Sequence, residues 1–160
     1  MKRRLSVFIS LLFGCFLSSS LAFSESLLRV DMEYILATKA PSLLFTITNI
    51  SKSDLIFNAA DLPWGNRYSV LIIGSTKSQP CLQQTHFIDD PRPDSITIKS
   101  GEKVQGTIAL KKHIENFDEV LRKEDVLLFW HYEAKTKDTK EVGQYGGWIK
   151  VNKIDGFSID

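Results

Sequence analysis

The chain has 160 residues, 43% of them hydrophobic, and carries 20 Lys and Arg against 19 Asp and Glu, a formal net charge of +1. Three of the basic residues, Lys2, Arg3 and Arg4, belong to a segment with the layout of a secretory signal peptide. Removing these three leaves 17 basic against 19 acidic residues, a net charge of −2, which excludes a basic nucleic-acid-binding character for the remainder.

The predicted signal peptide spans residues 1–24, and residues 25–160 are long enough for one domain with a core of its own. Small residues favour cleavage after Ala22 or after Ser24. The apolar run over 5–17 is shorter than the about 20 residues that span a bilayer, so no transmembrane segment is expected in the mature chain. A periplasmic or secreted protein is therefore predicted. Because LFGC, ending at Cys15, resembles a lipoprotein box, a lipid anchor at Cys15 is the alternative.

Cys81 is the only cysteine besides Cys15. The mature chain therefore has no partner for an intrachain disulfide, and its core must hold the fold together. We expect Cys81 to be a free thiol, buried or partly shielded.

The first part of the chain alternates in the manner of half-buried strands. From Leu28 to Leu36 apolar residues occupy every second position, and segments 42–49 and 55–58 continue the pattern on either side of a polar turn at 49–54. A further strand is predicted over 68–73. Its continuous apolar run, Val70–Ile73, indicates that both of its faces are covered.

Two irregular stretches interrupt this pattern. Pro63, with Gly65 and Asn66 after it, predicts a turn that carries Trp64. We expect Trp64 to fold back over the end of the core, and ligand stacking is the alternative. Residues 76–94 have no periodicity, and loops of this length in a domain are usually functional or disordered.

The second half of the chain contains strands, one helix and a hairpin. Strands are predicted at 95–98 and 104–110 around a Gly turn. Apolar residues at helical spacing over 114–121 predict a short helix, and Asn116 followed by Glu119 resembles its capping box. The uncharged run VLLFWHY at 126–132 predicts a central strand, which forms a hairpin with 147–151 across a polar connection at 133–145.

Together these elements predict an all-β fold, an antiparallel immunoglobulin-like sandwich of seven or eight strands with one short helix. The segments SLLFTITNIS, ITIK and VQGTIAL around Ser-Gly-Glu, and VLLFWHY with GGWIKV are similar to those of exported bacterial immunoglobulin-like β-sandwich proteins. The paired cysteines of antibody domains are absent, and the resemblance implies no particular activity.

The sequence contains no motif of an enzyme or a cofactor site. It has no Gly-x-Ser-x-Gly elbow, no Gly-rich phosphate loop and no His-Glu-x-x-His helix, so we predict a non-enzymatic protein without a cofactor. His86, His113 and His131 are assigned to a loop, to the residues before the helix and to a strand, and are interpreted as solvated or core histidines.

Two groups of residues have the side chains of metal ligands, but neither is predicted to bind a metal. Cys81 and His86 could ligate copper, but the Met that usually follows is missing, since Met32 is the only methionine of the mature chain. Asp89, Asp90 and Asp94 could bind calcium, but Pro91 and Pro93 stiffen the segment and Arg92 adds a positive charge.

The remaining feature is the apolar character of both faces of the 126–132 strand. The first explanation is that the 114–121 helix or a neighbouring loop covers the second face. The alternative is a partner or ligand surface with the aromatic residues Trp64, Trp130, Tyr132 and Trp148, although Trp130 is itself expected in the core. The predicted function is an exported non-catalytic domain that recognises another envelope protein. The alternatives are a carbohydrate-binding module and a cell-wall glycan hydrolase.

Overall fold

The computed structural model describes residues 26–37, 40–85 and 94–154. In this part of the chain all strand pairs are antiparallel. Its elements are the strands β1 (Leu28–Ala37), β2 (Ala40–Asn49), β3 (Leu55–Asn58), β4 (Val70–Ser75), β5 (Ser95–Ile98), β6 (Lys103–Ala109), β7 (Val126–Lys135) and β8 (Glu141–Val151), the 3-10 turns η1 (Ala59–Asp61) and η2 (Leu110–Lys112), and the helix α1 (Phe117–Lys123).

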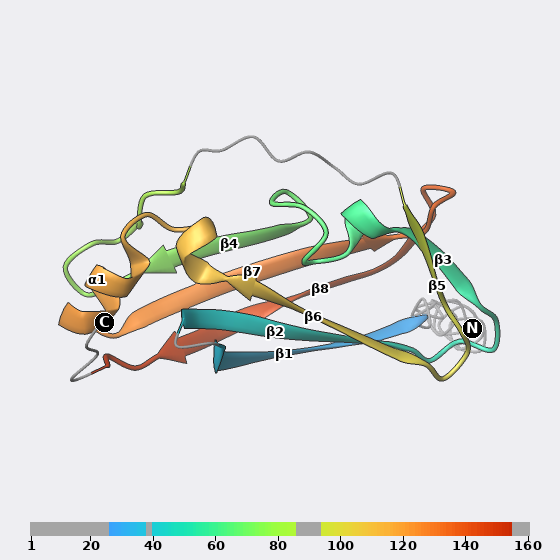
Figure 1. Ribbon diagram of the computed structural model, residues 1–160, viewed down its shortest axis with the longest axis horizontal. Helices are drawn as coiled ribbons and strands as arrows, with labels where there is room; N and C mark the ends of the chain where they lie inside the picture. The colour runs from blue at the N-terminus through green and yellow to red at the C-terminus, as the bar shows by residue number, and fades with distance from the viewer. Residues whose placement is uncertain (1–25, 38–39, 86–93, 155–160) are drawn as a thin grey trace, which may run out of the picture.

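The strands form two facing three-stranded sheets, in the orders β1-β2-β6 and β4-β7-β8, and a separate β3-β5 pair. Figure 1 shows the two larger sheets as layers, with α1 at one end and β3 and β5 at the other. The strand order in these two sheets matches that of the A-B-E and C-F-G strands of an immunoglobulin-like sandwich. The all-β prediction of seven or eight strands with one short helix is confirmed.

The core lies between the two layers because each central strand turns every second side chain inward. Leu43, Phe45 and Ile47 of β2 are completely buried, and Trp130 of β7 is 7% exposed. The ring of Trp130 meets that of Phe45 edge to face, with centroids 5.3 Å apart and an interplanar angle of 82°. This arrangement adds to the stabilisation from burial alone. The expectation that Trp130 belongs to the core is confirmed.

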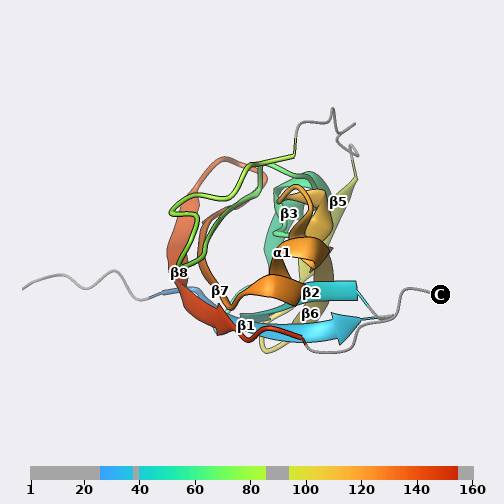
Figure 2. The same ribbon diagram turned by 90° about the vertical axis from the view of Figure 1, so that its left-hand side faces the viewer.

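The helix α1 closes one end of the sandwich (Figure 2). Phe117 and Leu121 are its buried residues. The predicted capping box is wrong: Asn116 adopts the left-handed conformation with φ 52°, and its side chain makes no cap hydrogen bond. Asn tolerates that conformation better than most residues, and its backbone carbonyl accepts the first helical bonds, from the N–H groups of Glu119 and Val120.

Trp64 folds back onto the core, as expected. It is partly buried and packs against the core residues. A Cβ atom on Gly106 of β6 would lie 2.0 Å from Cδ2 of Trp64, so only a glycine lets the indole ring approach this strand so closely.

The β7–β8 hairpin is longer than predicted, because both strands continue through the stretch expected to be a polar connection. Glu133 and Lys135 are exposed, while Ala134 between them and Val142 of β8 are buried. The alternation therefore persists beneath the charged side chains. The turn is confined to residues 136–140, where the N–H of Thr136 donates to the carbonyl of Lys140 at 2.9 Å.

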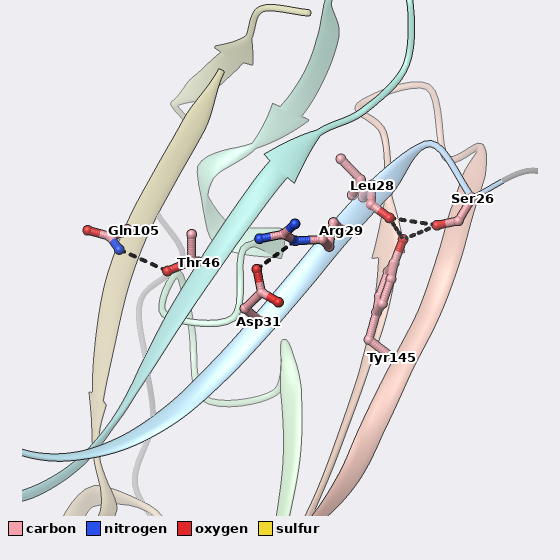
Figure 3. Close-up of polar contacts among 7 residues, drawn as sticks. All are labelled: Ser26, Leu28, Arg29, Asp31, Thr46, Gln105 and Tyr145. Carbon is pink, nitrogen blue, oxygen red and sulfur yellow. Dashed lines mark hydrogen bonds and ion pairs between the residues drawn. The ribbon is translucent and has the colours of Figure 1, made fainter. Parts of the chain in front are cut away.

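A seam joins the two layers where β1 lies beside β8. The hydroxyl of Tyr145 on β8 donates to the carbonyl of Leu28 on β1 at 3.0 Å, and the hydroxyl of Ser26 donates to the same carbonyl at 2.7 Å (Figure 3). The two hydroxyl oxygens also lie 2.8 Å apart, and because each hydroxyl has one proton, two of these three contacts can be hydrogen bonds at a time. The seam therefore satisfies a backbone acceptor at a sheet edge.

Part of the predicted 76–94 loop is ordered against β4. The N–H of Leu82 donates to the carbonyl of Gly74 at 2.8 Å, and the side-chain amide of Gln84 donates to the carbonyl of Ile72 at 2.9 Å. Leu82 is buried in the core. Residues 76–85 therefore protect the free edge of β4.

Candidate functional site

The strongest candidate surface is the outer face of the β4-β7-β8 sheet. Cross-strand pairing places Ile73 of β4, Phe129 of β7 and Trp148 of β8 in one row across the three strands. Leu71 lies opposite His131 in the next row, and Leu127 lies opposite Lys150 in the row on the other side. We call Leu71, Ile73, Leu127, Phe129 and Trp148 the outer patch.

The outer patch is open to solvent. Trp148 is 66% exposed, Leu71 49%, Leu127 42% and Ile73 37%. The partly buried ring of Phe129 lies 5.0 Å from that of Trp148, centroid to centroid, at an interplanar angle of 52°. On β8 the same-face neighbour two residues before Trp148 is Gly146, which has no side chain to cover the indole. The exposed tryptophan is thus supported from one side and accessible from the other.

Charged groups of both signs border the outer patch. Glu133 and Lys135 of β7 form an ion pair at 3.2 Å, and Lys150 of β8 pairs with Asp125 at 2.7 Å. Hydrogen bonds from the Lys150 side chain and from the Lys153 backbone N–H hold the pKa of Asp125 below its ordinary value. An apolar centre with a polar, solvated border is the usual composition of a protein–protein contact surface.

Neither α1 nor residues 76–85 cover this face, which contradicts the expectation that the helix or a neighbouring loop packs there. The buried residues of α1, Phe117 and Leu121, belong to the core. The helix itself lies at the end of the sandwich (Figure 2). The expectation that β4 is covered on both faces is also wrong, because Val70 and Ile72 are buried while Leu71 and Ile73 are exposed. A short continuous apolar run does not by itself distinguish a doubly covered strand from one with an exposed apolar face.

The structure separates the four aromatic residues predicted as a ligand or partner surface. Trp148 alone belongs to the outer patch. Trp64 lies at the core margin near β6, and Trp130 and Tyr132 point inward from β7. These last two are not surface residues, because on β7 the even-numbered positions face the core.

Tyr132 is completely buried, and its hydroxyl has no hydrogen-bond partner among the described residues. Burial, with a smaller contribution from Asp61, raises the pKa of this phenol above its ordinary value. A buried hydroxyl without a partner costs stability. Tyr132 therefore contributes to the core through its ring and not through its oxygen.

The histidines and the other candidate metal ligands do not form a cluster among the described residues. His113 is buried and His131 lies on the outer face of β7, whereas His86, Asp89 and Asp90 fall outside the described residues. Within the described ranges no three His, Cys, Asp or Glu side chains converge as a metal site. Cys81 is a free thiol as expected, but it is exposed and not shielded.

Sequence reasoning missed Leu71 and Ile73 as surface residues. The signal was present: both alternate with the buried Val70 and Ile72, and β4 pairs with β7, whose second face is also apolar. The pairing partner of β4 is a long-range feature that local periodicity does not contain. Only the pairing makes the outer patch continuous across three strands.

Within the described residues, no helix has both the length and the hydropathy needed to cross a membrane. No protein-family model matches the chain, and neither does any curated protein. The solved structures similar to it include the X-ray structure of the Northeast Structural Genomics Consortium target SoR45. That structure matches at 12% sequence identity with a TM-score of 0.37, over 87% of this chain and 95% of the other.

Proposed function

We propose that the chain is an exported, non-catalytic binding domain of the bacterial envelope that recognises another protein through the outer patch. The observation that carries the proposal is the uncovered row of Ile73, Phe129 and Trp148 across three strands. Contiguous exposed apolar surface with a polar border is typical of interaction sites. The export segment, residues 1–24, lies outside the described residues, and a lipid anchor at Cys15 remains the alternative to a periplasmic or secreted form.

Trp148 is the expected centre of the binding energy. A tryptophan side chain buries 150–250 Å² when it is fully covered. With 66% of the residue exposed, a partner that covered it would remove roughly 130 Å² of apolar surface from water. At about 25 cal/mol per Å² this contributes about 3 kcal/mol, the size expected for a hot-spot residue.

The aliphatic composition of the outer patch favours a protein partner over a glycan. Sugar rings stack on flat aromatic faces, and the outer patch offers one such exposed face, that of Trp148. Leu71, Ile73 and Leu127 are branched side chains that interdigitate with other side chains. A carbohydrate-binding module is therefore the second candidate, supported by the exposed indole of Trp148 alone.

The test compares two matched aliphatic residues on different sheets. Leu71 of the outer patch and Ile56 of β3 are 49% and 47% exposed. A photo-crosslinking side chain placed at each position in cells should capture one defined envelope protein from position 71 and not from position 56. That protein, purified, should bind the parent chain and the Ile56→Ser variant equally, and the Leu71→Ser variant more weakly.

Trp148→Ala should weaken the same interaction by about 100-fold, the equivalent of about 3 kcal/mol. A captured protein whose affinity is unchanged by both Leu71→Ser and Trp148→Ala would overturn the assignment of the outer patch. Binding of cell-wall glycan fragments that quenches Trp148 fluorescence, without any protein captured, would favour the carbohydrate-binding alternative. Release of new reducing ends from cell wall, abolished by one carboxylate substitution, would establish a glycan hydrolase.

A further inference from the structure

We infer that the free edge of β6 is a second binding surface, independent of the outer patch, that accepts an extended acidic segment of another protein as an added strand. The β1-β2-β6 sheet ends at β6, and no described strand pairs with its outer side. Immunoglobulin-like folds commonly have a fourth strand in this sheet, next to the strand that corresponds to β6. Here the candidate for that place, β5, pairs with β3 instead.

The departure of β5 begins at the turn before β6. Gly101, with φ 77°, donates its N–H to the carbonyl of Asn49, and the N–H of Asn49 donates to the carbonyl of Glu102, at 2.9 and 3.0 Å. Two residues thus oppose one, the pattern of a bulge with glycine in its first position, which bends a strand and increases its twist. The bulge directs β5 toward β3, and among the described residues no strand lies beside the outer edge of β6.

The same hydrogen bonds define which groups of β6 face outward. Because Asn49 is hydrogen-bonded to Glu102, the alternating ladder directs the backbone of Val104, Gly106 and Ile108 toward β2. The N–H and carbonyl groups of Gln105 and Thr107 therefore point to the free edge, and no described residue bonds to them. Both residues are exposed. The Gln105 side chain turns away to donate to Oγ1 of Thr46 at 2.9 Å, so it does not cover the edge (Figure 3).

The charges beside this edge select the partner. Lys99, Lys103, Lys111 and Lys112 lie before, on and after β6, with Glu102 the single acidic residue between Lys99 and Lys112. All four lysines are exposed. Lysines on an edge strand oppose pairing with a like-charged strand. Antiparallel pairing of β6 with its own copy about Gly106 would place Lys103 of each molecule opposite Ala109 of the other, two positions from Lys111 in η2, and this approach of like charges disfavours self-association. An acidic strand has the complementary charge.

A small hollow at the end of β6 supplies a place for a side chain of the added strand. It has a volume of ≈ 120 Å³ and is lined by Trp64, Ile108, Ala109 and Lys112, together with other residues of the 63–67 turn and His113. No described Asp or Glu contributes to its lining. Strand addition gains affinity from backbone bonds and specificity from such side-chain sites.

The test uses synthetic peptides and leaves the protein unchanged. A peptide of alternating Val and Glu, added to the ¹⁵N-labelled protein, should slow amide hydrogen exchange at Gln105 and Thr107 and leave exchange at Leu71 and Trp148 unaltered. An alternating Val and Lys peptide should produce no protection. Two N-methylated forms of the Val/Glu peptide, one methylated at the odd and one at the even positions, are then compared. One form should bind about tenfold or more weakly than the unmethylated peptide, because only every second N–H group of an added strand faces β6.

Two variants of the protein complete the test. Gln105→Pro removes an outward N–H and should abolish peptide protection at Thr107, whereas Gln105→Ala keeps the N–H and should bind as the parent does. If Gln105→Pro fails to fold, the methylated peptides decide. The inference is overturned if the Val/Glu peptide protects neither amide, or if the Val/Lys peptide binds equally well. It is also overturned if the two methylated peptides bind with equal affinity, or if the protein without peptide shows the same protection by self-association.

Discussion

Trp130 and Trp148 form an internal comparison, because they lie on adjacent strands and face opposite sides of the same sheet. Trp130 is 7% exposed and packs edge to face on Phe45, whereas Trp148 is 66% exposed. We predict that Trp130→Ala strongly destabilises the protein and that Trp148→Ala does not. The comparison holds the residue type and the substitution constant and changes only the burial.

The expected magnitude follows from the packing. Truncating a buried Trp to Ala costs about 3–5 kcal/mol, and the edge-to-face contact with Phe45 adds about 0.5–1.5 kcal/mol beyond the buried area. A loss of about 4 kcal/mol is a large part of the about 5–15 kcal/mol by which domains are stable. For Trp148→Ala we expect a change within about 1 kcal/mol, as for most surface substitutions.

Urea denaturation followed by far-UV circular dichroism measures both values without depending on tryptophan emission. With a denaturant slope of about 2 kcal/mol per M, Trp130→Ala should lower the unfolding midpoint by about 2 M, and Trp148→Ala by less than about 0.5 M. A double-mutant cycle with Phe45→Leu should recover the edge-to-face term as a coupling energy. A midpoint for Trp130→Ala equal to that of the parent would refute the assignment of this ring to the core.

Three further predictions concern single residues of the core and its margin. Tyr132→Phe should raise the free energy of unfolding by about 1 kcal/mol, because the hydroxyl is buried without a partner. Because burial raises the pKa of Tyr132, the free energy of unfolding should be unaffected by this group below the ordinary tyrosine pKa of about 10 and should fall as the pH rises above it. The Tyr132→Phe variant should lose part of this decrease at alkaline pH. Unfolding of the parent and the variant measured over the same pH series tests the direction of the effect. Gly106→Ala should lower the free energy of unfolding by about 1–3 kcal/mol, because the added Cβ collides with Trp64, and by much less in a Trp64→Ala background. Equal losses of stability in both backgrounds would contradict the contact. Asn49→Ala should lower the free energy of unfolding by about 2–4 kcal/mol, since the buried amide donates to the carbonyls of Ser53 and Ile98 and accepts from Ser51. Thermal denaturation measures this change, and an unchanged stability would exclude the network as a determinant of stability.

Local alternation was sufficient to predict most strands and the sandwich class. The pattern from Leu28 onward and the uncharged run at 126–132 determine which positions are strands, because a period of two is a property of the chain itself. The expectation that Trp130 belongs to the core rests on a different argument, that a large ring on a central strand is more often core than surface. Alternation alone cannot separate Trp130 and Tyr132 from the surface set, since both faces of β7 are apolar.

The remaining features depend on long-range pairing or on backbone conformations that residue type does not determine. The pairing of β5 with β3, and the consequent free edge of β6, cannot be read from either segment alone. The cap of α1 was mispredicted because Asn is favoured both as an N-cap and in the left-handed conformation, and the second applies at Asn116. Predicting the exposure of Leu71 and Ile73 requires knowing that no described element crosses the outer face of the sheet.

The seam between β1 and β8 has a consequence for the order of folding. The hydrogen bond from Tyr145 to Leu28 joins residues that are 117 positions apart, whereas the β1–β2 ladder connects neighbours in the chain. Contacts between residues far apart in the sequence form late, because the entropy of closing a long loop is lost before the contact contributes any stabilisation. If the chain is exported as proposed and emerges amino end first, β1 and β2 can pair early, whereas the carbonyl of Leu28 receives its bond from Tyr145 only after β8 has emerged. During that interval the first sheet lacks this connection to the second, and the two layers are not yet joined along the seam.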